Sequence, residues 1–431
     1  MLDINLIRQD QKGVEEKLGK RGVEVDLTPL LKLDAQKRKL QTQNEILKAE
    51  HNKQSKIPLV LGADEAVRAE HNAAARARKE EIAKNDAKVA KLEKKFFDLL
   101  VALPNIPSEE SVAGGKEANQ VIRTFGKQPS FNFQPKDHME LCTSLKLIDY
   151  ERGAKLSGAG SWVYTDMGAR LEFALWNYFI NFHVENGYKL TMVPHLLNYQ
   201  SGYTAGQFPK FADDVFVTNF HKDITQSKFL LPTSETALVN MHRDEIIKED
   251  ELPIKYAGFS PCYRKEAGGY GAAERGMIRG YQFNKVEMFI FCHASESEAL
   301  HQELVANAEK LANGLGLHFQ TVLLSAGDTG AAMAKTYDIE VFIPSMKGYK
   351  EVSSVSNAMD YQARRANIRT KVHECSDGVC KPKTQFIHTL NASGLATSRI
   401  IPAIVEQFQN ADGSVTVPEV LRKYGLPERI G

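Results

Sequence analysis

The chain has 431 residues, of which 42% are hydrophobic and 25% are charged, and its formal net charge is +1. This composition is typical of globular proteins and excludes collagenous and largely disordered chains, while the length exceeds the roughly 250 to 300 residues that one core usually serves. No apolar run approaches the ~18 residues of a membrane span, and residues 1–5 lack a signal or transit pattern. We therefore expect at least two domains in a cytoplasmic protein.

The N-terminal region has the pattern of paired helices. Residues 1–95 contain no Phe, Tyr or Trp, although the whole chain is 9% aromatic. Apolar residues recur at seven-residue spacing in two runs, at Leu33, Leu40 and Leu47 and at Ala75, Ile82, Val89, Phe96 and Leu103. This spacing keeps an apolar stripe on one side of a helix. With a proline and a glycine in 57–62 to stop the first helix and Asp64 to cap the second, it predicts an antiparallel helical hairpin over about 28–103.

The predicted hairpin is basic. Residues 28–103 hold 16 Lys and Arg against 11 Asp and Glu, and the rest of the chain is slightly acidic. A basic surface favours a polyanion as partner. A charged hairpin can equally be a dimerisation or spacer coiled coil, and the polar seam residues Lys37 and Asn44 leave its purpose open.

A second region begins after the proline-containing linker at 103–108, and its composition is different. Aromatic and β-branched residues return in short runs at 188–193, 277–283 and 286–291, which alternate with helical stretches at 295–315 and 406–409. This alternation predicts an α+β domain over 109–431 with an antiparallel sheet, preceded by an N-terminal domain over 1–108.

The cysteines predict neither a disulfide framework nor a metal site. Five cysteines are an odd number in a long chain, which favours reduced thiols. Cys375 and Cys380 could form half of a metal knuckle, but no second pair lies nearby, and a structural zinc site needs four ligands. We interpret residues 375–380 as a surface loop.

Residues suited to chemistry lie in the second region. A strand, a long glycine-rich loop and a second strand are predicted over 260–287, and the side-chain period of two places Phe283, Lys285 and Glu287 on one strand face. With Arg264 on the first strand, these residues could stack a base, bind an ammonium group and hold a phosphate. Each residue alone is more often a surface ion pair or a core aromatic.

Two further segments, 231–235 and 389–399, are also rich in polar residues. In the second of them a glycine precedes a helix that carries Arg399, an arrangement suited to a triphosphate. Patterns of the P-loop, of the dinucleotide-binding Gly-x-Gly-x-x-Gly strand and of protein kinases are absent from the sequence. A nucleotide site would therefore be built in another way.

Taken together, these segments resemble the three motifs of class II aminoacyl-tRNA synthetases. The matching segments are 187–194 for motif one, Arg264-x-Glu266 with Gln282-Phe283 for motif two, and the segment ending at Arg399 for motif three. Residues 233–235, 351–357 and 362–365, together with the helical arm, resemble the seryl-tRNA synthetase family over nearly the whole chain. The resemblance implies an N-terminal antiparallel two-helix coiled-coil arm followed by a class II catalytic domain, whose antiparallel sheet is flanked by helices.

The resemblance also implies a function, that of a serine–tRNA ligase. Such an enzyme activates L-serine with ATP to seryl-adenylate and pyrophosphate, and then transfers the seryl group to the 3′ end of tRNA(Ser). Whether tRNA(Sec) is also charged stays open. The arm is expected to bind the tRNA, Mg²⁺ to accompany ATP, and two chains to form a homodimer through the region of Pro194.

Adenylate formation requires charge neutralisation and in-line positioning more than acid–base chemistry. By resemblance, Arg264 bridges the serine carboxylate and the α-phosphate, Arg399 holds the γ-phosphate, and Glu351 with Ser354 holds Mg²⁺, so Arg264, Arg399 and Glu351 are the expected catalytic residues. The residues expected around serine are Thr233, Ser234, Glu235, Arg264, Glu287, Asn391 and Ser393. The residues expected around ATP are Arg264, Lys265, Glu266, Gly280, Tyr281, Gln282, Phe283, Glu351, Val352, Ser353, Ser354 and Arg399.

The sequence departs from the family pattern at Gly280-Tyr281, where Val-His is usual, at Lys265 and at 158–162. These departures concern the adenine subsite and the entry to the domain. Two other functions compete with the ligase. A homologue that loads a carrier protein would lack the long arm, and a binding protein with an inactive catalytic fold would not be expected to retain the polar residues above.

Overall fold

The computed structural model describes residues 1–55, 65–218, 223–266, 276–376 and 379–431. These residues form two compact units. The larger unit comprises Met1, residues 20–22 and residues 105–431, and the smaller comprises 2–19 and 23–104. The chain thus leaves the larger unit after Gly22 and returns to it at Asn105.

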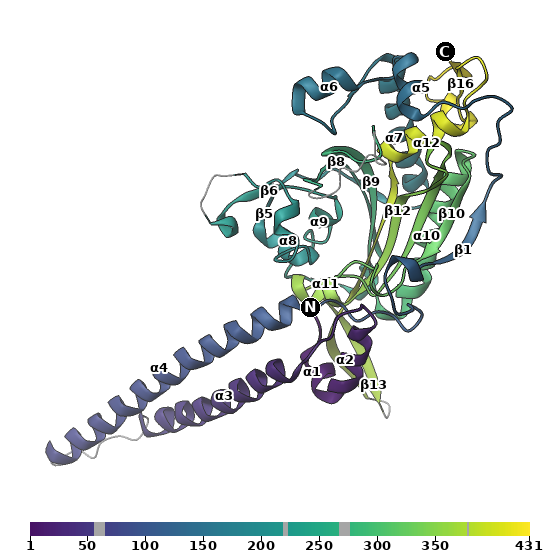
Figure 1. Cartoon of the computed structure of the whole chain (residues 1–431). Coiled ribbons are helices and arrows are strands. Elements are labelled where there is room, and N and C mark those ends of the chain that lie inside the picture. The colour runs from purple at the N-terminus through teal and green to yellow at the C-terminus, as the bar shows by residue number, and fades with distance from the viewer. Residues whose placement is uncertain (56–64, 219–222, 267–275, 377–378) are drawn as a thin grey trace. The chain divides into compact units, whose positions relative to one another are not determined.

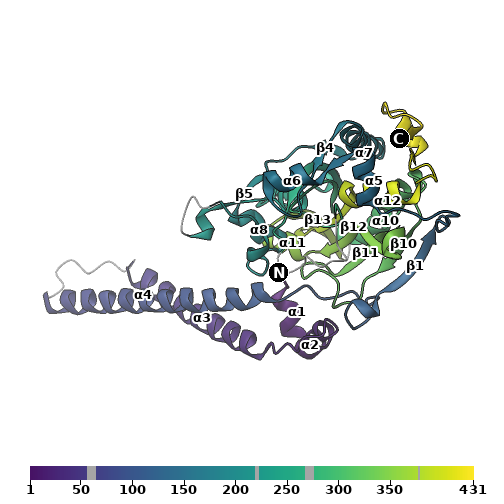
Figure 2. The ribbon, with the colours of Figure 1, turned by 45° about the horizontal axis from the view of Figure 1, so that its top comes forward.

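The smaller unit is helical, as predicted. Its described helices are α1 (Ile4–Gln9), α2 (Gln11–Gly19), α3 (Thr28–Ser55) and α4 (Glu65–Ala102). Figures 1 and 2 show α3 and α4 as two long helices lying side by side, and pairs such as Lys37 with Glu93 and Lys48 with Asp86 fix their antiparallel direction. The predicted helical hairpin is confirmed, whereas its turn at 57–62 and the cap Asp64 lie outside the described residues.

The interface between α3 and α4 is partly polar. Asn44 is only 3% exposed, and its Nδ2 donates a hydrogen bond of 2.6 Å to Asp86 Oδ1, which Lys48 Nζ also contacts at 2.9 Å. Nearer the base of the hairpin, Lys37 Nζ lies 4.4 Å from the centre of the Phe96 ring. Polar groups at seam positions reduce stability but select one register, so these contacts specify how the two helices align.

The larger unit is built on an eight-stranded sheet. In spatial order its strands are β1 (Gln120–Phe125), β10 (Phe319–Leu323), β11 (Lys335–Ile343), β12 (Gly348–Met359), β15 (His388–Ala396), β9 (Gln282–Cys292), β8 (Ile254–Tyr263) and β4 (Lys189–Thr191). Neighbouring strands pair antiparallel except β4 and β8, which are parallel. The predicted antiparallel sheet is confirmed.

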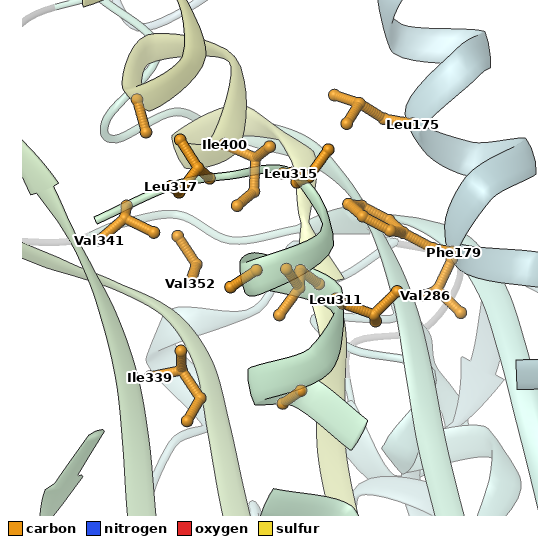
Figure 3. Close-up of a cluster of buried hydrophobic side chains, with 14 of the residues drawn as sticks. Leu175, Phe179, Val286, Leu311, Leu315, Leu317, Ile339, Val341, Val352 and Ile400 are labelled. Carbon is orange, nitrogen blue, oxygen red and sulfur yellow. The ribbon is translucent and has the colours of Figure 1, made fainter. Parts of the chain in front are cut away.

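Helices cover one face of this sheet and bury a large apolar cluster against it. The long helices are α7 (Asp166–Glu185), α10 (Ser297–Gly314) and α12 (Thr397–Gln407). Figure 3 shows side chains from all three helices meeting strand residues, among them Phe179, Leu311, Ile400, Ile339 and Val352. The predicted helix at 295–315 matches α10, and the one at 406–409 is only the end of the longer α12.

Shorter elements surround the sheet. The remaining helices are α5 (His138–Ser144), α6 (Tyr150–Ser157), α8 (Tyr199–Ala205), α9 (Glu235–Leu238), α11 (Tyr361–Ala366) and α13 (Glu419–Arg422). The remaining strands are β2 (Ile148–Asp149), β3 (Val163–Tyr164), β5 (Leu196–Asn198), β6 (Lys228–Leu230), β7 (Ile246–Ile247), β13 (Arg369–Ser376), β14 (Val379–Phe386), β16 (Val415–Thr416) and β17 (Arg429–Ile430). Among the described residues, no helix combines the length and the apolar character required to span a bilayer.

Two local predictions were wrong. The predicted strand at 277–283 contributes only its last two residues to β9, because Met277 and Ile278 are both buried in the core and so do not alternate as strand residues do. Of the predicted loop at 375–380, residues 375–376 belong to β13 and 379–380 to β14, in whose antiparallel register the backbone positions of Cys375 and Cys380 are opposite each other, and 377–378 lie outside the described residues. Most of the glycine-rich loop at 267–276 lies outside the described residues.

The pleat of the central strands separates core residues from functional ones. In β15, Leu390 and Ala392 are buried in the apolar cluster, whereas the intervening Asn391 lines a cavity. In β9, Val286 likewise faces the core, and Glu287 faces the cavity. Because successive side chains of a strand point to opposite faces, one apolar face supports the fold and the other is free to carry polar chemistry.

Candidate active site

A cavity of about 470 Å³ lies on the polar face of the central strands. It is lined by residues that the sequence places in four separate segments: Thr233, Glu235, Arg264, Glu287, Glu351, Ser354, Asn391, Ser393 and Arg399. They meet because β8, β9, β15 and β12 are neighbours in the sheet. Strand pairing therefore gathers most of the residues that were expected around serine, together with the expected catalytic residues.

Arg264 lies directly after β8, at the wall of the cavity. Its Nε donates to the carbonyl oxygen of Pro232 at 3.3 Å, and its Cζ lies 5.0 Å from the centre of the Phe283 ring. The backbone N–H of Arg264 also donates to the carbonyl oxygen of Tyr281 at 3.0 Å. These contacts hold a planar cation beside an aromatic ring, an arrangement that can bind a phosphate next to a stacked base.

Arg399 comes from the first turn of α12 and reaches the same cavity. Its Nη1 donates to the backbone carbonyl oxygen of Glu351 at 2.6 Å and lies 3.6 Å from Glu351 Oε2, while Nε donates to the carbonyl oxygen of Ile278 at 3.1 Å. The Arg399 side chain is 30% exposed and that of Glu351 is 45% exposed. Both charged groups therefore remain accessible to a ligand.

A smaller hollow adjoins the cavity on the side of Arg264 and Phe283. Its lining includes Arg264, Glu266, Gly280, Phe283, Glu351, Val352, Ser393 and Arg399. Glu266 pairs with Arg279 at 2.6 Å. A side chain at Gly280 would meet Trp162, whose Cζ3 lies 2.2 Å from the position of an added Cβ. Gly280 is one of the positions at which the sequence departs from the family pattern. It must be a glycine here because any larger side chain would overlap Trp162.

Tyr281 and Gln282 line a different hollow, of about 600 Å³, which Phe283 shares. Its walls include Trp162 and Trp176. Tyr281 and Gln282, which were expected around ATP, therefore line the hollow that Arg399 does not reach. Phe283 lines both hollows, so the two residues lie next to the proposed stacking ring.

A buried lysine organises the polar end of the cavity. Lys285 is 6% exposed, its Nζ donates to Thr233 Oγ1 at 2.8 Å, and it forms an ion pair with Glu287, which is 1% exposed. The sequence placed Lys285 on the correct strand face without giving it a role. The sequence feature that indicates its position is the two-residue spacing of Phe283, Lys285 and Glu287. This spacing predicts that all three side chains face the ligand.

Glu235 is held by a hydrogen-bond chain beneath the cavity. Gln362 Nε2 donates to Glu235 Oε1 at 2.7 Å, and Thr389 Oγ1 donates to Gln362 Oε1 at 2.7 Å. Burial raises the pKa of Glu235 to about 7, and the nearby charge of Glu287 adds to the increase. A carboxyl whose pKa is raised by burial and by a neighbouring negative charge is suited to a cationic ligand, which would favour its ionised form.

Oxygen ligands for a metal lie along β11 and β12. Glu351 and Ser354 line the cavity with Asp338, whose Oδ1 is buried and has no hydrogen-bond partner. Burial raises the pKa of Asp338 well above its usual value, and the charge of Glu351 adds to the effect. The described residues contain no group of three or more His, Cys, Asp or Glu that could hold a metal by itself. The carboxylate and hydroxyl oxygens of Glu351 and Ser354 are donors of the kind that Mg²⁺ prefers, together with phosphate oxygens.

Sequence reasoning did not identify Asp338 or Glu340. Both line the cavity, while Ile339 between them is buried in the core. The alternation of acidic and apolar residues in β11 could have indicated that both carboxylates face away from the core.

Three residues that were expected to contact serine or ATP make hydrogen bonds to other parts of the chain instead. Ser234 is fully buried, and its hydroxyl lies 2.6 Å from that of Ser260. Ser353 is also fully buried and donates to the carbonyl oxygen of Ser393 at 2.5 Å. The backbone N–H of Lys265 donates to the carbonyl oxygen of Asp214 at 3.0 Å, and its side chain does not line the hollows described above. Ser234 and Ser353 thus support neighbouring segments, since neither hydroxyl faces the cavity.

Comparisons with known proteins cover both units of the chain. Residues 1–107 match the family model of the seryl-tRNA synthetase N-terminal domain, and residues 218–408 match the tRNA synthetase class II core domain (G, H, P, S and T). Serine--tRNA ligase 2 of Clostridium acetobutylicum is 52% identical over 425 residues, which are 98% of this chain and 99% of the relative. Serine--tRNA ligase of Carboxydothermus hydrogenoformans is 42% identical over 438 residues, covering 100% of this chain and 99% of the relative.

A solved structure agrees with these relatives. The seryl-tRNA synthetase from Pyrococcus horikoshii complexed with ATP has a TM-score of 0.89 and 32% sequence identity, covering 100% of this chain and 99% of that one. The family resemblance of the motifs is therefore confirmed over the full length, helical arm included. The chain belongs to the seryl-tRNA synthetase family of class II aminoacyl-tRNA synthetases.

Proposed function

We propose that the cavity is where this chain, as a serine–tRNA ligase, activates serine with ATP. A serine carboxylate oxygen attacks the α-phosphorus, the bond from that phosphorus to the bridging oxygen of the β-phosphate breaks, and pyrophosphate leaves with the electron pair. The observation that carries this proposal is the meeting of Arg264 and Arg399 with a buried acidic pocket in one cavity. Two arginines can neutralise the reacting anions, and the pocket can orient the amino group.

The nucleotide is proposed to lie in the smaller hollow, with its adenine against Phe283. Arg264 would then contact the α-phosphate, and Arg399 would contact the γ-phosphate. Glu351 and Ser354 would hold Mg²⁺, which when bound neutralises phosphate charge as a hard Lewis acid. The accessibility of Arg399 and Glu351 supports these roles, because neither side chain is fully committed to protein contacts.

Serine is proposed to lie at the polar end of the cavity. Glu235 and Glu287 would receive its ammonium group, and Thr233, Asn391 and Ser393 would surround its hydroxyl. Lys285 would keep Thr233 and Glu287 in place through the contacts described above. A pocket that hydrogen-bonds a hydroxyl leaves polar groups unpaired when alanine binds, and such pockets reject the smaller analogue by up to roughly 10⁴-fold or more.

In the second step, a ribose hydroxyl at the 3′ end of tRNA attacks the carbonyl carbon of seryl-adenylate. The bond between that carbon and the phosphate oxygen breaks, and AMP leaves. We propose that α3 and α4 form the coiled-coil arm that binds the tRNA(Ser). The excess of 16 Lys and Arg over 11 Asp and Glu in residues 28–103 supports this role. RNA helices are recognised mainly through shape and phosphates, for which a basic helical surface is suited.

Serine-dependent exchange of pyrophosphate into ATP, followed by acylation of tRNA, tests the function. We expect exchange with serine and acylation of tRNA(Ser), and tRNA(Sec) transcripts assayed in parallel decide whether that tRNA is also a substrate. Exchange without acylation of either tRNA would favour a carrier-loading enzyme. A complete lack of exchange would contradict the ligase function.

Deletion of residues 30–100 tests the arm separately. The shortened chain should form seryl-adenylate at the normal rate but should no longer charge tRNA, because the phosphate contacts are lost. As a control in the full-length chain, reversing the exposed charges of Lys84, Lys88 and Lys91 on α4 should weaken acylation and make it less dependent on salt. Normal charging by both proteins would contradict the role of the arm.

We also propose that two copies pair through the edge of the sheet. Strand β4 is at this edge; its Leu190 is 48% exposed, Met192 directly after the strand is 77% exposed, and Phe173 on α7 is 59% exposed. An exposed apolar edge strand is suited to pairing with a second chain. Sedimentation should therefore show a dimer that Met192→Glu dissociates, and a monomeric parent chain would contradict the proposal.

A cytoplasmic location is proposed as well. Cys142, Cys262 and Cys292 are free and buried. Free thiols are typical of proteins that work in a reducing compartment.

A further inference from the structure

Arg21 belongs to the larger unit, and its side chain donates hydrogen bonds to four backbone carbonyl oxygens of that unit. It lies in the turn between α2 and α3, and its Nε donates to the carbonyl oxygen of Asn105 at 2.9 Å. Its two terminal nitrogens reach a single loop, donating to the carbonyl oxygens of Ala326 at 3.1 Å, Thr329 at 2.8 Å and Met333 at 2.6 Å. The planar fork of an arginine can satisfy this many acceptors at once, which a lysine cannot do.

The loop at 326–333 depends on such donors because the residues whose carbonyl oxygens accept from Arg21 are buried. Ala326, Thr329 and Met333 are 0%, 3% and 9% exposed. Buried carbonyl groups without partners are costly, and few occur in native proteins. Asn105 supplies further donors to the same loop: its backbone N–H donates to Ala331 at 2.7 Å, and its Nδ2 donates to Ala332 at 3.0 Å. Arg21 and Asn105 thus both donate to carbonyl oxygens of this loop, while its N-terminal end also donates to Val112 and Gly114 through the backbone N–H groups of Ala326 and Gly327.

The opposite side of this loop forms part of the cavity wall. Asp328, Gly330 and Met333 line the cavity together with Asn391. Asn391 Nδ2 also contacts Met333 Sδ at 3.6 Å. A single residue, Met333, therefore accepts the hydrogen bond from Arg21 through its carbonyl oxygen and contacts the proposed serine subsite through its side chain.

From this geometry we propose that Arg21 is a positioning residue for the serine subsite. It lies 312 positions before Met333 in the sequence, and it acts by fixing the loop that holds Met333 against Asn391. The inference rests on the proposed placement of serine beside Asn391. It assigns to the N-terminal segment a role in amino-acid binding that is separate from RNA binding by the arm.

The test is the KM for serine against the KM for ATP in pyrophosphate exchange, measured on the full-length chain. Arg21→Met should raise the serine KM about tenfold or more, because small displacements of positioning groups have effects of this size. The ATP KM should change far less, because the loop lines the serine end and not the nucleotide hollow. Arg21→Lys keeps the charge but not the fork, so it should also raise the serine KM.

Lys20→Met is the matched control. Lys20 is the neighbouring cation, and its ion pair with Glu109 at 3.7 Å involves a carboxylate that is 73% exposed. This variant should leave the serine KM unchanged. Asn105→Ala removes the second support of the loop and should reproduce the effect of Arg21→Met on the serine KM. It also serves as the deciding variant if Arg21→Met does not fold.

Asn391→Ala separates this inference from the proposed function. An unchanged serine KM in Asn391→Ala would show that serine does not bind there, and both proposals would fail. If Asn391→Ala raises the serine KM while the Arg21 and Asn105 variants do not, only the positioning role of Arg21 is overturned. Equal increases in the serine and ATP KM values of the Arg21 variants would also overturn it, because a general loss of structure has that result.

Discussion

The smaller unit and the cavity both contain buried carboxyl groups, but the pKa of such a group is lowered in the smaller unit and raised in the cavity. In the smaller unit Asp34 is 1% exposed, and Arg8 contacts both of its oxygens at 2.7 and 2.8 Å. Burial alone would raise the pKa of Asp34, but the hydrogen bonds and charge of Arg8 hold it below its usual value. In the cavity, burial raises the pKa values of Glu235 and Asp338.

The direction of the pKa shift distinguishes buried carboxyl groups that stabilise the fold from those that are suited to binding a ligand. A buried carboxylate whose pKa is lowered already has its partner within the protein, and removing that partner costs stability. A buried carboxylate whose pKa is raised lacks sufficient compensation and is ready for a cationic ligand. Variants in the two regions should therefore fall into two classes, one that loses activity and one that loses stability.

The largest effect is expected in the cavity. Arg264→Ala should reduce pyrophosphate exchange by about 10³-fold, because a preorganised cation that meets developing charge is worth this much or more. The unfolding midpoint should change little, since among the described residues the side chain makes a single hydrogen bond, of 3.3 Å. Arg152, an arginine that is 76% exposed, provides the control, and Arg152→Ala should retain full exchange. Full exchange by Arg264→Ala would refute the assigned role.

The second expected effect is on the stability of the smaller unit. Arg8→Ala leaves the buried Asp34 carboxylate with Arg38, at 3.1 Å, and the charge of Lys37 as its remaining compensation. Unfolding of this unit should become easier by about 2 kcal/mol, below the cost of a fully buried pair because Arg8 is 29% exposed. Urea denaturation followed by circular dichroism measures this loss. Pyrophosphate exchange should stay normal, and reduced exchange would contradict the separation into two classes.

The pH dependence of this loss has a definite sign. Because the folded pKa of Asp34 is lowered, its contribution to stability is present at neutral pH and disappears as the pH falls through its unfolded and then its folded value. The difference between the parent chain and Arg8→Ala should therefore shrink in acid.

A smaller effect is expected for serine binding as a function of pH. The pKa of Glu235 is raised to about 7, so this carboxyl is largely protonated at pH 6 and ionised at pH 8. Binding of the serine ammonium group favours the ionised form, and affinity should be lost as the pH falls through that value. The serine KM should drop about tenfold from pH 6 to pH 8, in proportion to the ionised fraction. Glu235→Gln should remove this pH dependence, and a parent chain with a flat profile would contradict it.

The smallest effect concerns the register of the hairpin. Asn44→Leu replaces a buried amide that donates to Asp86 at 2.6 Å. The hairpin should gain up to about 1 kcal/mol, because polar seam residues specify register at a cost in stability. Acylation of tRNA should decrease if the helices slip, while exchange is unaffected. Cysteine cross-linking between α3 and α4 measures the alignment, and a single unchanged register in Asn44→Leu would show that other contacts specify it.

Much of this architecture could be predicted from short stretches of sequence. The seven-residue repeat that includes Leu40 and Val89 predicts the paired helices, because it states the geometry of one helix face. Alternation in β9 and β15 similarly predicts that Glu287 and Asn391 lie on the face opposite the core. The motif residues Arg264 and Arg399 then indicate the kind of chemistry.

Local patterns failed where distant contacts compete with them. Residues 277–283 have the composition of a strand, yet Met277 and Ile278 both enter the core, and a glycine is required beside Trp162. Ser234 and Ser353 lie within motif segments, but their hydroxyls are used by Ser260 and by a backbone carbonyl. A motif assigns a segment to a site without stating which of its side chains face the ligand.

The sequence by itself therefore determined the helical arm, the α+β sheet domain and the family of reactions, since each depends on periodicity or on short motifs. Only the tertiary structure decided how Lys285 joins Thr233 to Glu287, why Asp338 Oδ1 has no hydrogen-bond partner among the described residues and why Arg21 supports a loop of the cavity. The physical reason is how far apart in the sequence the interacting residues lie. Periodicity depends on neighbouring residues, whereas the partners of a buried polar group are selected by packing between separate segments, which for Arg21 and Met333 are 312 positions apart.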